Sequence, residues 1–168
     1  MITVSIVSLN NISDLTRCID SIIKFNRNLE FQIIVVAYLF TDENIKILKK
    51  KYPFITIVIN NEIAGFSENH NLALKMAKGE YCLILNDDTY FEDNSIEVLV
   101  NTMNKHKDID ILSPIILNKD STVQFNGRTK FTLLFWLTHQ LRIDKYFYYF
   151  SKYQNRNQLY RTYNISGA

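Results

Sequence analysis

Apolar residues follow two alternating patterns along most of the chain. Nearly continuous apolar runs predict buried strands at residues 2–9, 31–39, 54–59 and 81–85. Between these runs, apolar residues recur at spacings of three and four, which predicts amphipathic helices. Each helix is expected to begin at a capping side chain: Ser13, Thr41 with Asp42, Ser67 and Asp93. Gly79 is expected just past the end of the third helix.

A further apolar run at residues 109–117, interrupted by Pro114, predicts a fifth strand. Strands that are apolar on both faces and alternate with helices are typical of a parallel sheet covered on both sides. We therefore expect an α/β fold with a mostly parallel sheet and helices on both faces. Such sheets bind ligands in the crevice at the carboxyl ends of their strands. The polar residues at those ends are the candidates: Ser8, Asn10, Tyr38, residues 60–65 and residues 86–88.

Length and composition place these elements in one domain over residues 1–168. Hydrophobic residues make up 47% of the 168, and there are only four Gly and two Pro, which excludes disordered and collagen-like chains. No bilayer span or secretory signal is visible. Cys18 and Cys82 lie singly in a predicted helix and strand, which is typical of core thiols. A cytoplasmic protein is expected.

The charges divide the chain after residue 127. Residues 1–127 carry 12 Lys and Arg against 16 Asp and Glu, whereas residues 128–168 carry seven against one. The second segment also holds 11 of the 22 aromatic residues. This change predicts an acidic α/β core followed by a basic aromatic extension. Because the core is acidic and no recognition motif appears, nucleic-acid binding is not expected.

An acidic turn follows the fourth predicted strand. Asn86, Asp87 and Asp88 place two carboxylates and an amide at the end of a buried run. Oxygen ligands of this kind suit Mg²⁺ or Mn²⁺, which keep positions open for substrate phosphates. The alternative is a turn in which Asp and Asn bond to nearby backbone groups. His70, His106 and His139 are not spaced as a metal-ligand cluster.

Two segments around this turn form a longer motif. Residues 64–74 contain a Gly-Phe pair and a helix with a later Asn, and residues 77–88 read small-x-Gly-Glu-Tyr, then a strand ending in Asn-Asp-Asp. These features resemble the signature of the family 2 glycosyltransferases. The opening strand is similar to the family's first strand, and residues 125–128 and 165–168 resemble later landmarks of its rhamnosyltransferase-like branch. The resemblance implies the GT-A fold, a Rossmann-like nucleotide-diphospho-sugar transferase fold.

The resemblance also implies roles for individual residues. Asp88 matches a metal-coordinating aspartate, and Asp87 and Asn86 complete the motif that contacts ribose and metal. The implied nucleotide-sugar-binding residues are Ser8, Asn10, Tyr38, Gly65, Asn71, Asn86 and Asp87, with Asp88 and Asp87 on the metal. Two readings of the Asn71 side chain stay open, namely contact with the ligand or a tie between two loops.

Three positions depart from the family pattern. Ala37 replaces a base-binding Asp, Leu9 replaces an aromatic residue, and Ile63 replaces an Asn. An apolar pocket edge with Tyr38 as a platform could still enclose a base. In the family the catalytic carboxylate lies downstream of a Ser-Gly-Ala landmark, which here is Ser166 to Ala168. The catalytic base is therefore expected beyond Ala168, and the 168 residues are expected to be the front portion of a larger domain.

These observations predict a metal-assisted, inverting glycosyltransferase acting in cell-surface polysaccharide biosynthesis. The donor would be a UDP-type or dTDP-type sugar, the acceptor a glycan or lipid-linked molecule, and the cofactor Mn²⁺ or Mg²⁺. The alternative is a non-catalytic module of the same fold that binds nucleotide or serves as a membrane or partner adaptor.

The extension at residues 128–168 adds a membrane hypothesis. Its apolar residues have helical spacing and are interleaved with Arg and Lys, as in segments that bind the inner membrane face peripherally. An ordinary helical segment packed over the sheet is the alternative.

The second predicted helix ends in three cations, Lys49, Lys50 and Lys51. The helix dipole favours cations at this end, so they need no ligand to explain them.

Overall fold

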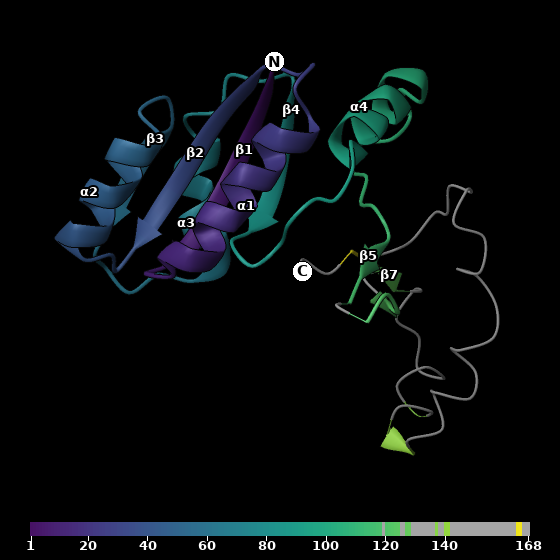
Figure 1. Ribbon diagram of the computed structural model, residues 1–168. Coiled ribbons are helices and arrows are strands. Elements are labelled where there is room, and N and C mark those ends of the chain that lie inside the picture. Colours follow the sequence, from purple (N-terminus) through teal and green to yellow (C-terminus); the bar gives the residue numbers. More distant parts are fainter. Residues whose placement is uncertain (119, 125–126, 129–136, 138–139, 142–163, 166–168) are drawn as a thin grey trace. The chain divides into compact units, whose positions relative to one another are not determined.

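The computed structural model describes residues 1–118, 120–124, 127–128, 137, 140–141 and 164–165. Its main element is a four-stranded sheet in the order β3-β2-β1-β4, in which every pairing is parallel (Figure 1). The strands are β1 (Ile2–Leu9), β2 (Phe31–Tyr38), β3 (Thr56–Asn60) and β4 (Tyr81–Asn86). The helices between and after them are α1 (Ile12–Phe25), α2 (Asp42–Lys51), α3 (Phe66–Leu74) and α4 (Ser95–Lys105).

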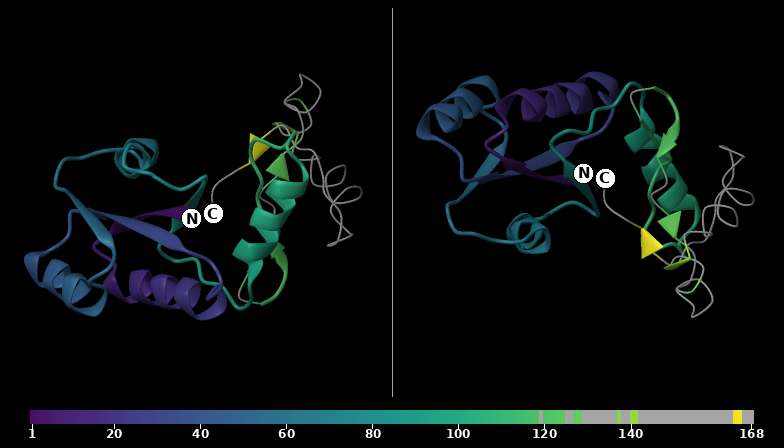
Figure 2. Two further views of the ribbon diagram at one scale, coloured as in Figure 1. Left: turned by 90° about the horizontal axis from the view of Figure 1, so that it is seen from above. Right: turned by 90° about the horizontal axis from the view of Figure 1, so that it is seen from below.

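Helices cover both faces of the sheet. α1 and α2 lie on one face and α3 on the other (Figure 2). Along β2, Ile33 and Val35 belong to the larger core under α1 and α2, whereas Ile34 and Val36 pack with Ala73 of α3. Both faces of this strand are thus buried, which is why its sequence is continuously apolar. The predicted α/β class with a mostly parallel sheet is confirmed.

The α3-facing side of β1 is polar, which the apolar sequence pattern did not predict. Thr3 and Ser5 are fully buried there. The Thr3 hydroxyl donates to Gln32 Oε1 at 2.7 Å and accepts from the Gly79 backbone N–H at 2.9 Å. Ser5 Oγ lies 2.8 Å from His70 Nδ1. These partners satisfy the buried hydroxyls, so that they can lie within the sheet core.

The prediction of a fifth strand over residues 109–117 is wrong for most of this range. Only Ile116–Leu117 (β5) is extended, and it pairs antiparallel with β6 (Val123–Gln124) outside the main sheet. Pro114 lacks an N–H and cannot donate to a sheet ladder. A second short antiparallel pair joins β7 (Gly127–Arg128) and β8 (Asn164–Ile165). These ladders belong to a compact unit, Ser113–Ser166, that is separate from Met1–Leu112. The single domain over residues 1–168 stays a prediction, and most of the extension at 128–168 lies outside the described residues.

Three helix caps differ from the prediction by one or two positions. Asn11, not Ser13, caps α1, since its Oδ1 accepts from the Asp14 N–H. Gly65 precedes α3 in place of Ser67, and Asn94 precedes α4 in place of Asp93. Thr41 caps α2 as predicted. Several polar residues adjoin each helix start, and sequence spacing does not select among them.

The two cysteines occupy different environments. Cys18 is fully buried in the core under α1, as predicted. The prediction that Cys82 is a core thiol is wrong, because Cys82 is exposed. It lies on β4, the last strand of the described sheet, in register with Thr3 and therefore on the α3 side. α3 packs mainly on β1 and β2, which leaves that side of β4 less covered.

Gly79 allows the chain to pass close to the start of β1. α3 ends at Leu74, so that Gly79 does not cap it as predicted. A Cβ at Gly79 would lie 2.4 Å from the Thr3 backbone nitrogen. We expect Gly79→Ala to lower the free energy of unfolding by about 3 kcal/mol, measured by urea denaturation. Gly65→Ala is the control, because its Cβ would meet only the flexible Glu68 carboxylate at 3.5 Å. Equal losses in the two variants would contradict this explanation.

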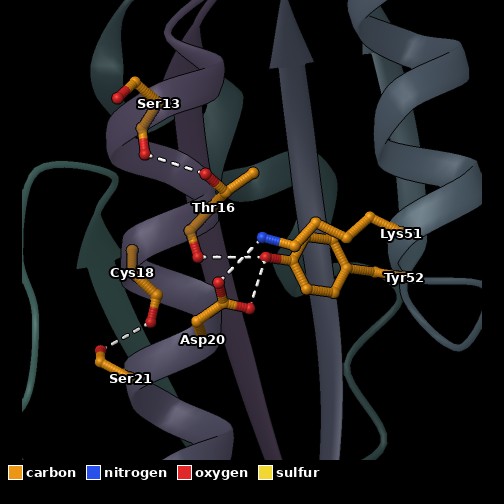
Figure 3. Close-up of polar contacts among 7 residues, drawn as sticks. All are labelled: Ser13, Thr16, Cys18, Asp20, Ser21, Lys51 and Tyr52. Carbon is orange, nitrogen blue, oxygen red and sulfur yellow. Dashed lines mark hydrogen bonds and ion pairs between the residues drawn. The ribbon is translucent and has the colours of Figure 1, made fainter.

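Tyr52, which follows the last residue of α2, forms hydrogen bonds to α1 (Figure 3). Its hydroxyl lies 2.7 Å from Asp20 Oδ1 and 3.1 Å from the Thr16 carbonyl oxygen. Lys51 Nζ donates to Asp20 Oδ2 at 2.8 Å, an exposed ion pair of small energetic value. Burial raises the pKa of Tyr52 to about 12 and that of Cys18 to about 12.

Alkaline pH should therefore destabilise the protein. A raised folded-state pKa means that the stabilisation is fully present below the unfolded pKa and is lost as pH rises through the folded pKa. For Cys18 and Tyr52 this window runs from 9.0 and 10.0, respectively, to about 12. We expect urea midpoints to fall steadily from pH 9 to pH 12, and to fall less steeply in Tyr52→Phe. An unchanged slope in that variant would show that Tyr52 does not contribute.

Candidate functional site

The acidic turn lies at the carboxyl end of the sheet, beside the end of β1. The register pairs Val7 with Asn86, which brings Ser8 next to Asp87 across 79 residues of sequence. The Ser8 hydroxyl donates to Asp87 Oδ2 at 2.5 Å, and Ser8 itself is buried. Asp88 is exposed, and no hydrogen bond or ion pair joins its carboxylate to the described residues. One carboxylate of the turn is thus fixed and the other faces solvent.

A third carboxylate, Asp14 in the first turn of α1, completes an acidic surface that sequence reasoning missed. Burial raises the pKa of Asp87, and the Asp88 and Asp14 charges raise it further, against the lowering effect of the Ser8 hydrogen bond. No ion pair neutralises these three carboxylates within the described part of the chain. Asp14 is identifiable only in three dimensions, because in sequence it is an ordinary acidic residue of a first helical turn.

The donor set fits a hard divalent cation. The described residues contain no group of three or more His, Cys, Asp or Glu side chains that could enclose a metal. Mg²⁺ is commonly held by only one or two carboxylates together with substrate phosphates, and Mn²⁺ takes the same oxygen ligands. Asp87 and Asp88 supply such a pair, and the pKa of Asp87 is raised by burial and then by neighbouring negative charge, both of which a bound cation would offset.

Helix α1 holds the acidic turn from the side. The Phe91 backbone N–H donates to Ser21 Oγ at 3.0 Å, and the Arg17 guanidinium lies 3.6 Å from the centre of the Tyr90 ring. The Cys18 thiol reaches the Asn86 carbonyl oxygen at 3.8 Å. Asn86 to Phe91 are therefore anchored at several points. Arg17 and Ser21 gave no signal of this role in the sequence, since both fit an amphipathic helix.

A bound cation should stabilise the protein more at neutral pH than in acid. Because burial, and then the Asp88 and Asp14 charges, raise the pKa of Asp87, its favourable contribution to stability is present below the unfolded pKa of 3.8 and is lost as pH rises through the folded pKa. A Mn²⁺ ion bound to the ionised carboxylate would offset that loss. We expect millimolar Mn²⁺ to raise the melting temperature at pH 7.5 by several degrees more than at pH 4.5. An equal rise in melting temperature at both pH values would contradict Mn²⁺ binding at Asp87.

Asn10 and Tyr38 lie where β1 and β2 end. Asn10 has a positive φ of 50°, and its Oδ1 accepts from the Thr41 N–H at 3.1 Å and from Asn44 Nδ2 at 2.9 Å. The Asn10 side chain thus ties β1 to the start of α2. Tyr38 is half-buried and pairs in register with Leu9 and Asn60. Contact of Asn10 and Tyr38 with a nucleotide sugar stays a prediction.

The three departures from the family pattern occupy different surroundings. Ala37 is fully buried in the core under α1 and α2. Leu9 and Ile63 are exposed, Ile63 by 94%. Apolar side chains are therefore exposed at the last residue of β1 and on the loop after β3, both at the carboxyl end of the sheet.

The loop between β3 and α3 is held by Asn69, which sequence reasoning missed. This side chain is 1% exposed, and its Nδ2 donates to the carbonyl oxygens of Ala64 at 3.2 Å and Gly65 at 3.1 Å. Its Oδ1 accepts from Asn60 Nδ2 at 2.7 Å. Asn71, the residue predicted from the motif, is exposed. The loop-tying role considered for Asn71 thus belongs to Asn69, and ligand contact by Asn71 stays a prediction.

His70 follows Asn69 and faces the sheet. Its ring is 2% exposed and packs edge-on against Phe66, with 4.4 Å between ring centres. Burial lowers its pKa, which favours the neutral ring. Nδ1 is paired with Ser5, whereas Nε2 has no partner among the described residues. His70 therefore has a packing role against the sheet.

Several predicted site residues thus come together. Ser8, Asn86, Asp87 and Asp88 share the ends of β1 and β4, and Gly65 stands at the start of α3, where its N–H donates to Glu68 at 2.6 Å. Ser166 to Ala168, and with them the expected position of the catalytic base, lie outside the described residues.

The chain is similar to known proteins in sequence and in fold. The profile of the family described as Glycosyl transferase family 2 matches residues 3–167. The minor teichoic acid biosynthesis protein GgaB of Bacillus subtilis (strain 168) is 32% identical over 124 residues. That match covers 70% of this chain but only 14% of GgaB, so the chain spans a small part of this curated relative.

Solved structures show a similar fold. Residues 1–349 of S. aureus TarS, in complex with UDP-GlcNAc, match with a TM-score of 0.62 and 22% identity over 77% of this chain and 38% of that one. The mannosyltransferase PcManGT from Pyrobaculum calidifontis, in complex with GDP-Man and Mn²⁺, matches with a TM-score of 0.55 and 21% identity over 70% of this chain and 35% of that one. The predicted GT-A fold is confirmed.

Proposed function

This chain belongs to glycosyl transferase family 2, and from that membership we propose that it takes part in moving a sugar from a nucleoside-diphosphate donor to a glycan or lipid-linked acceptor. The observation that carries the proposal is the acidic turn at the carboxyl end of the sheet, with Asp87 fixed by Ser8 and Asp88 free in solvent. This is the place at which parallel α/β sheets bind their ligands.

Each residue of the candidate site has its own proposed role in binding the donor. Asp88 and Asp87 would hold Mn²⁺ or Mg²⁺, and the cation, when bound, would neutralise the diphosphate as a Lewis acid. Asn86 and Ser8 line the same edge. Gly65, without a side chain, permits the sugar nucleotide to approach the start of α3 closely. Asn71 would contact the same ligand from α3.

The base of the nucleotide is expected near the ends of β1 and β2. Tyr38 offers an aromatic platform there, and Asn10 lies at the neighbouring strand end. Because Ala37 is buried and carries no polar group, selection of the base would depend on stacking and enclosure. We propose a UDP-type or dTDP-type donor, and the UDP-GlcNAc complex of the similar TarS structure supports the UDP choice.

The transfer itself needs a general base, and we assign this role to none of the described residues. We propose an inverting reaction in which this base comes from beyond Ala168 and deprotonates the acceptor hydroxyl. The relationship to GgaB supports a place in the synthesis of cell-surface polysaccharides. A cytoplasmic location, with peripheral contact at the inner membrane face, is part of the proposal. Within the described chain, no helix has the length and apolar character to cross a bilayer.

Calorimetry tests donor binding. We expect the 168-residue chain to bind UDP or dTDP in the presence of Mn²⁺, with weaker binding of GDP and none in excess EDTA. Absence of metal-dependent nucleotide binding at millimolar concentrations would overturn the proposal.

A non-catalytic module of the same fold is the second candidate, favoured by the buried Ala37 at the base-binding position. It predicts nucleotide binding without transfer. Sugar transfer, assayed with this chain and with a longer product of the same reading frame, separates the two functions.

A further inference from the structure

Basic side chains gather at the amino end of the sheet, opposite the candidate site. Both α1 and α2 run back from the carboxyl ends of the strands, so that their last turns lie at this other end (Figure 1). The exposed basic residues of these two helix ends are Lys24, Arg27, Lys49, Lys50 and Lys51. The acidic residues beside them are Asp20, which pairs with Lys51, and Glu30. The surface therefore carries a net positive charge.

Exposed apolar side chains lie among these cations. Phe54, just before β3, is 63% exposed, and Ile23 of α1 is 40% exposed. Both line a pocket of about 260 Å³ together with Asn26, Arg27 and Phe31. The Phe54 ring also meets the Tyr52 ring edge-on, beside Lys51. Lys24 in the last turn of α1 and Lys49 and Lys50 in the last turn of α2 lie at the same end of the sheet as this pocket. The exposed basic and apolar residues of this end are here called the amino-end patch: Ile23, Lys24, Arg27, Lys49, Lys50, Lys51 and Phe54.

We propose that the amino-end patch binds the surface of a membrane that contains anionic lipids. The helix dipole accounts for cations in the last turns of α1 and α2, but it does not account for an exposed Phe and Ile between them. A soluble polyanion would need only the charges. Cations interleaved with apolar side chains suit the lipid interface, where the cations attract headgroup phosphates and the apolar groups enter the acyl boundary.

The amino-end patch includes no residue of the basic extension at residues 128–168, and it rests on the proposed function in that it would supply the peripheral membrane contact proposed there. It also has a geometric consequence. Strand β1 has eight residues and spans about 25 Å. Docking through the amino-end patch would place the carboxyl ends of the strands away from the bilayer. The acidic turn would then lie roughly 25 Å from the membrane surface. An acceptor would then have to extend from the membrane to reach the site.

Vesicle flotation tests the proposal with the full chain. The probes are phosphatidylcholine vesicles with and without 30 mol% phosphatidylglycerol, at low and at high salt. We expect binding to the anionic vesicles only, weakening as salt rises. Lys49→Glu/Lys50→Glu should reduce the binding constant about tenfold or more, because each substitution removes an attraction to the anionic surface and adds a repulsion. Phe54→Ser should reduce it severalfold without changing charge.

The matched control is Lys46→Glu, which is compared with Lys50→Glu. Both reverse one exposed lysine of α2, but Lys46 lies one helical turn farther from the amino end of the sheet. Lys46→Glu should retain more of the binding than Lys50→Glu. If the two variants lose binding equally, the attraction follows net charge and the proposal fails.

Unchanged vesicle binding in Lys49→Glu/Lys50→Glu would assign the contact to another part of the chain and would also overturn the proposal. Heparin serves as the soluble polyanion. If Phe54→Ser binds both heparin and vesicles as the parent chain does, the patch recognises charge alone, and a membrane is not its specific partner. Urea denaturation and UDP calorimetry on each variant establish that fold and candidate site are intact.

Discussion

Asp88→Ala should abolish most metal-dependent nucleotide binding while leaving the fold intact. Asp88 is exposed, and its carboxylate makes no hydrogen bond or ion pair with the described residues, so its removal costs the folded state little. If Asp88 binds the cation that holds the diphosphate, the affinity for UDP in Mn²⁺ should fall about 100-fold or more, since even groups that only orient metal ligands are worth 10- to 100-fold. Calorimetry with UDP and Mn²⁺ measures the change.

The control is Asp93→Ala, which removes a nearby carboxylate that accepts from the Ser95 backbone N–H. We expect UDP affinity to remain within about twofold in this variant, with a loss of at most about 1 kcal/mol in the free energy of unfolding from the start of α4.

Asp87→Asn should also weaken metal binding. Because Asp87 accepts a hydrogen bond from Ser8, the free energy of unfolding should fall in this variant as well. Retention of full metal-dependent affinity in Asp88→Ala would remove the acidic turn from the metal site.

Asn69→Ala should destabilise the protein by about 3 kcal/mol. The substitution removes three hydrogen bonds at a side chain that is 1% exposed, and it leaves Asn60 Nδ2 and the carbonyl oxygens of Ala64 and Gly65 without this partner. Urea denaturation measures the loss. Because the loop with Gly65 would lose its anchor, nucleotide affinity should fall too.

Asn71→Ala is the matched control, two residues along the same helix. Asn71 is exposed, and we expect its removal to change the free energy of unfolding by less than about 0.5 kcal/mol. A loss of UDP affinity in this stable variant would support ligand contact by Asn71. Equal destabilisation by the two substitutions would contradict the anchoring role of Asn69.

The elements of the parallel sheet were predictable because their signals are local. The apolar run of β2 reflects burial on both faces, and the spacings of α1 and α2 reflect a single buried face. The place of Asn86 to Asp88 at the end of an apolar run was equally predictable. Cap positions were less so, since Asn11 and Ser13 are both good N-caps and only the turn at Asn10 decides between them.

The failures came where distant segments meet. Gly79 was read as a helix cap because glycine often ends helices, whereas it lies against the backbone of Thr3. Cys82 was placed in the core because β4 is apolar, although this edge strand leaves it exposed. Asn71 was chosen from the motif, but only the position of α3 on the sheet reveals that Asn69 faces the loop.

By itself, the sequence determined that strands and helices alternate, that the strands run parallel, and that two carboxylates end the fourth strand. These properties follow from periodicity and from neighbours a few residues apart. The tertiary structure decided that Ser8 binds Asp87, that the Asp14 charge lies near Asp87, and that Ile23, Arg27 and Phe54 line one pocket. Those relations depend on strand register and helix placement, because packing brings together side chains that no local spacing connects.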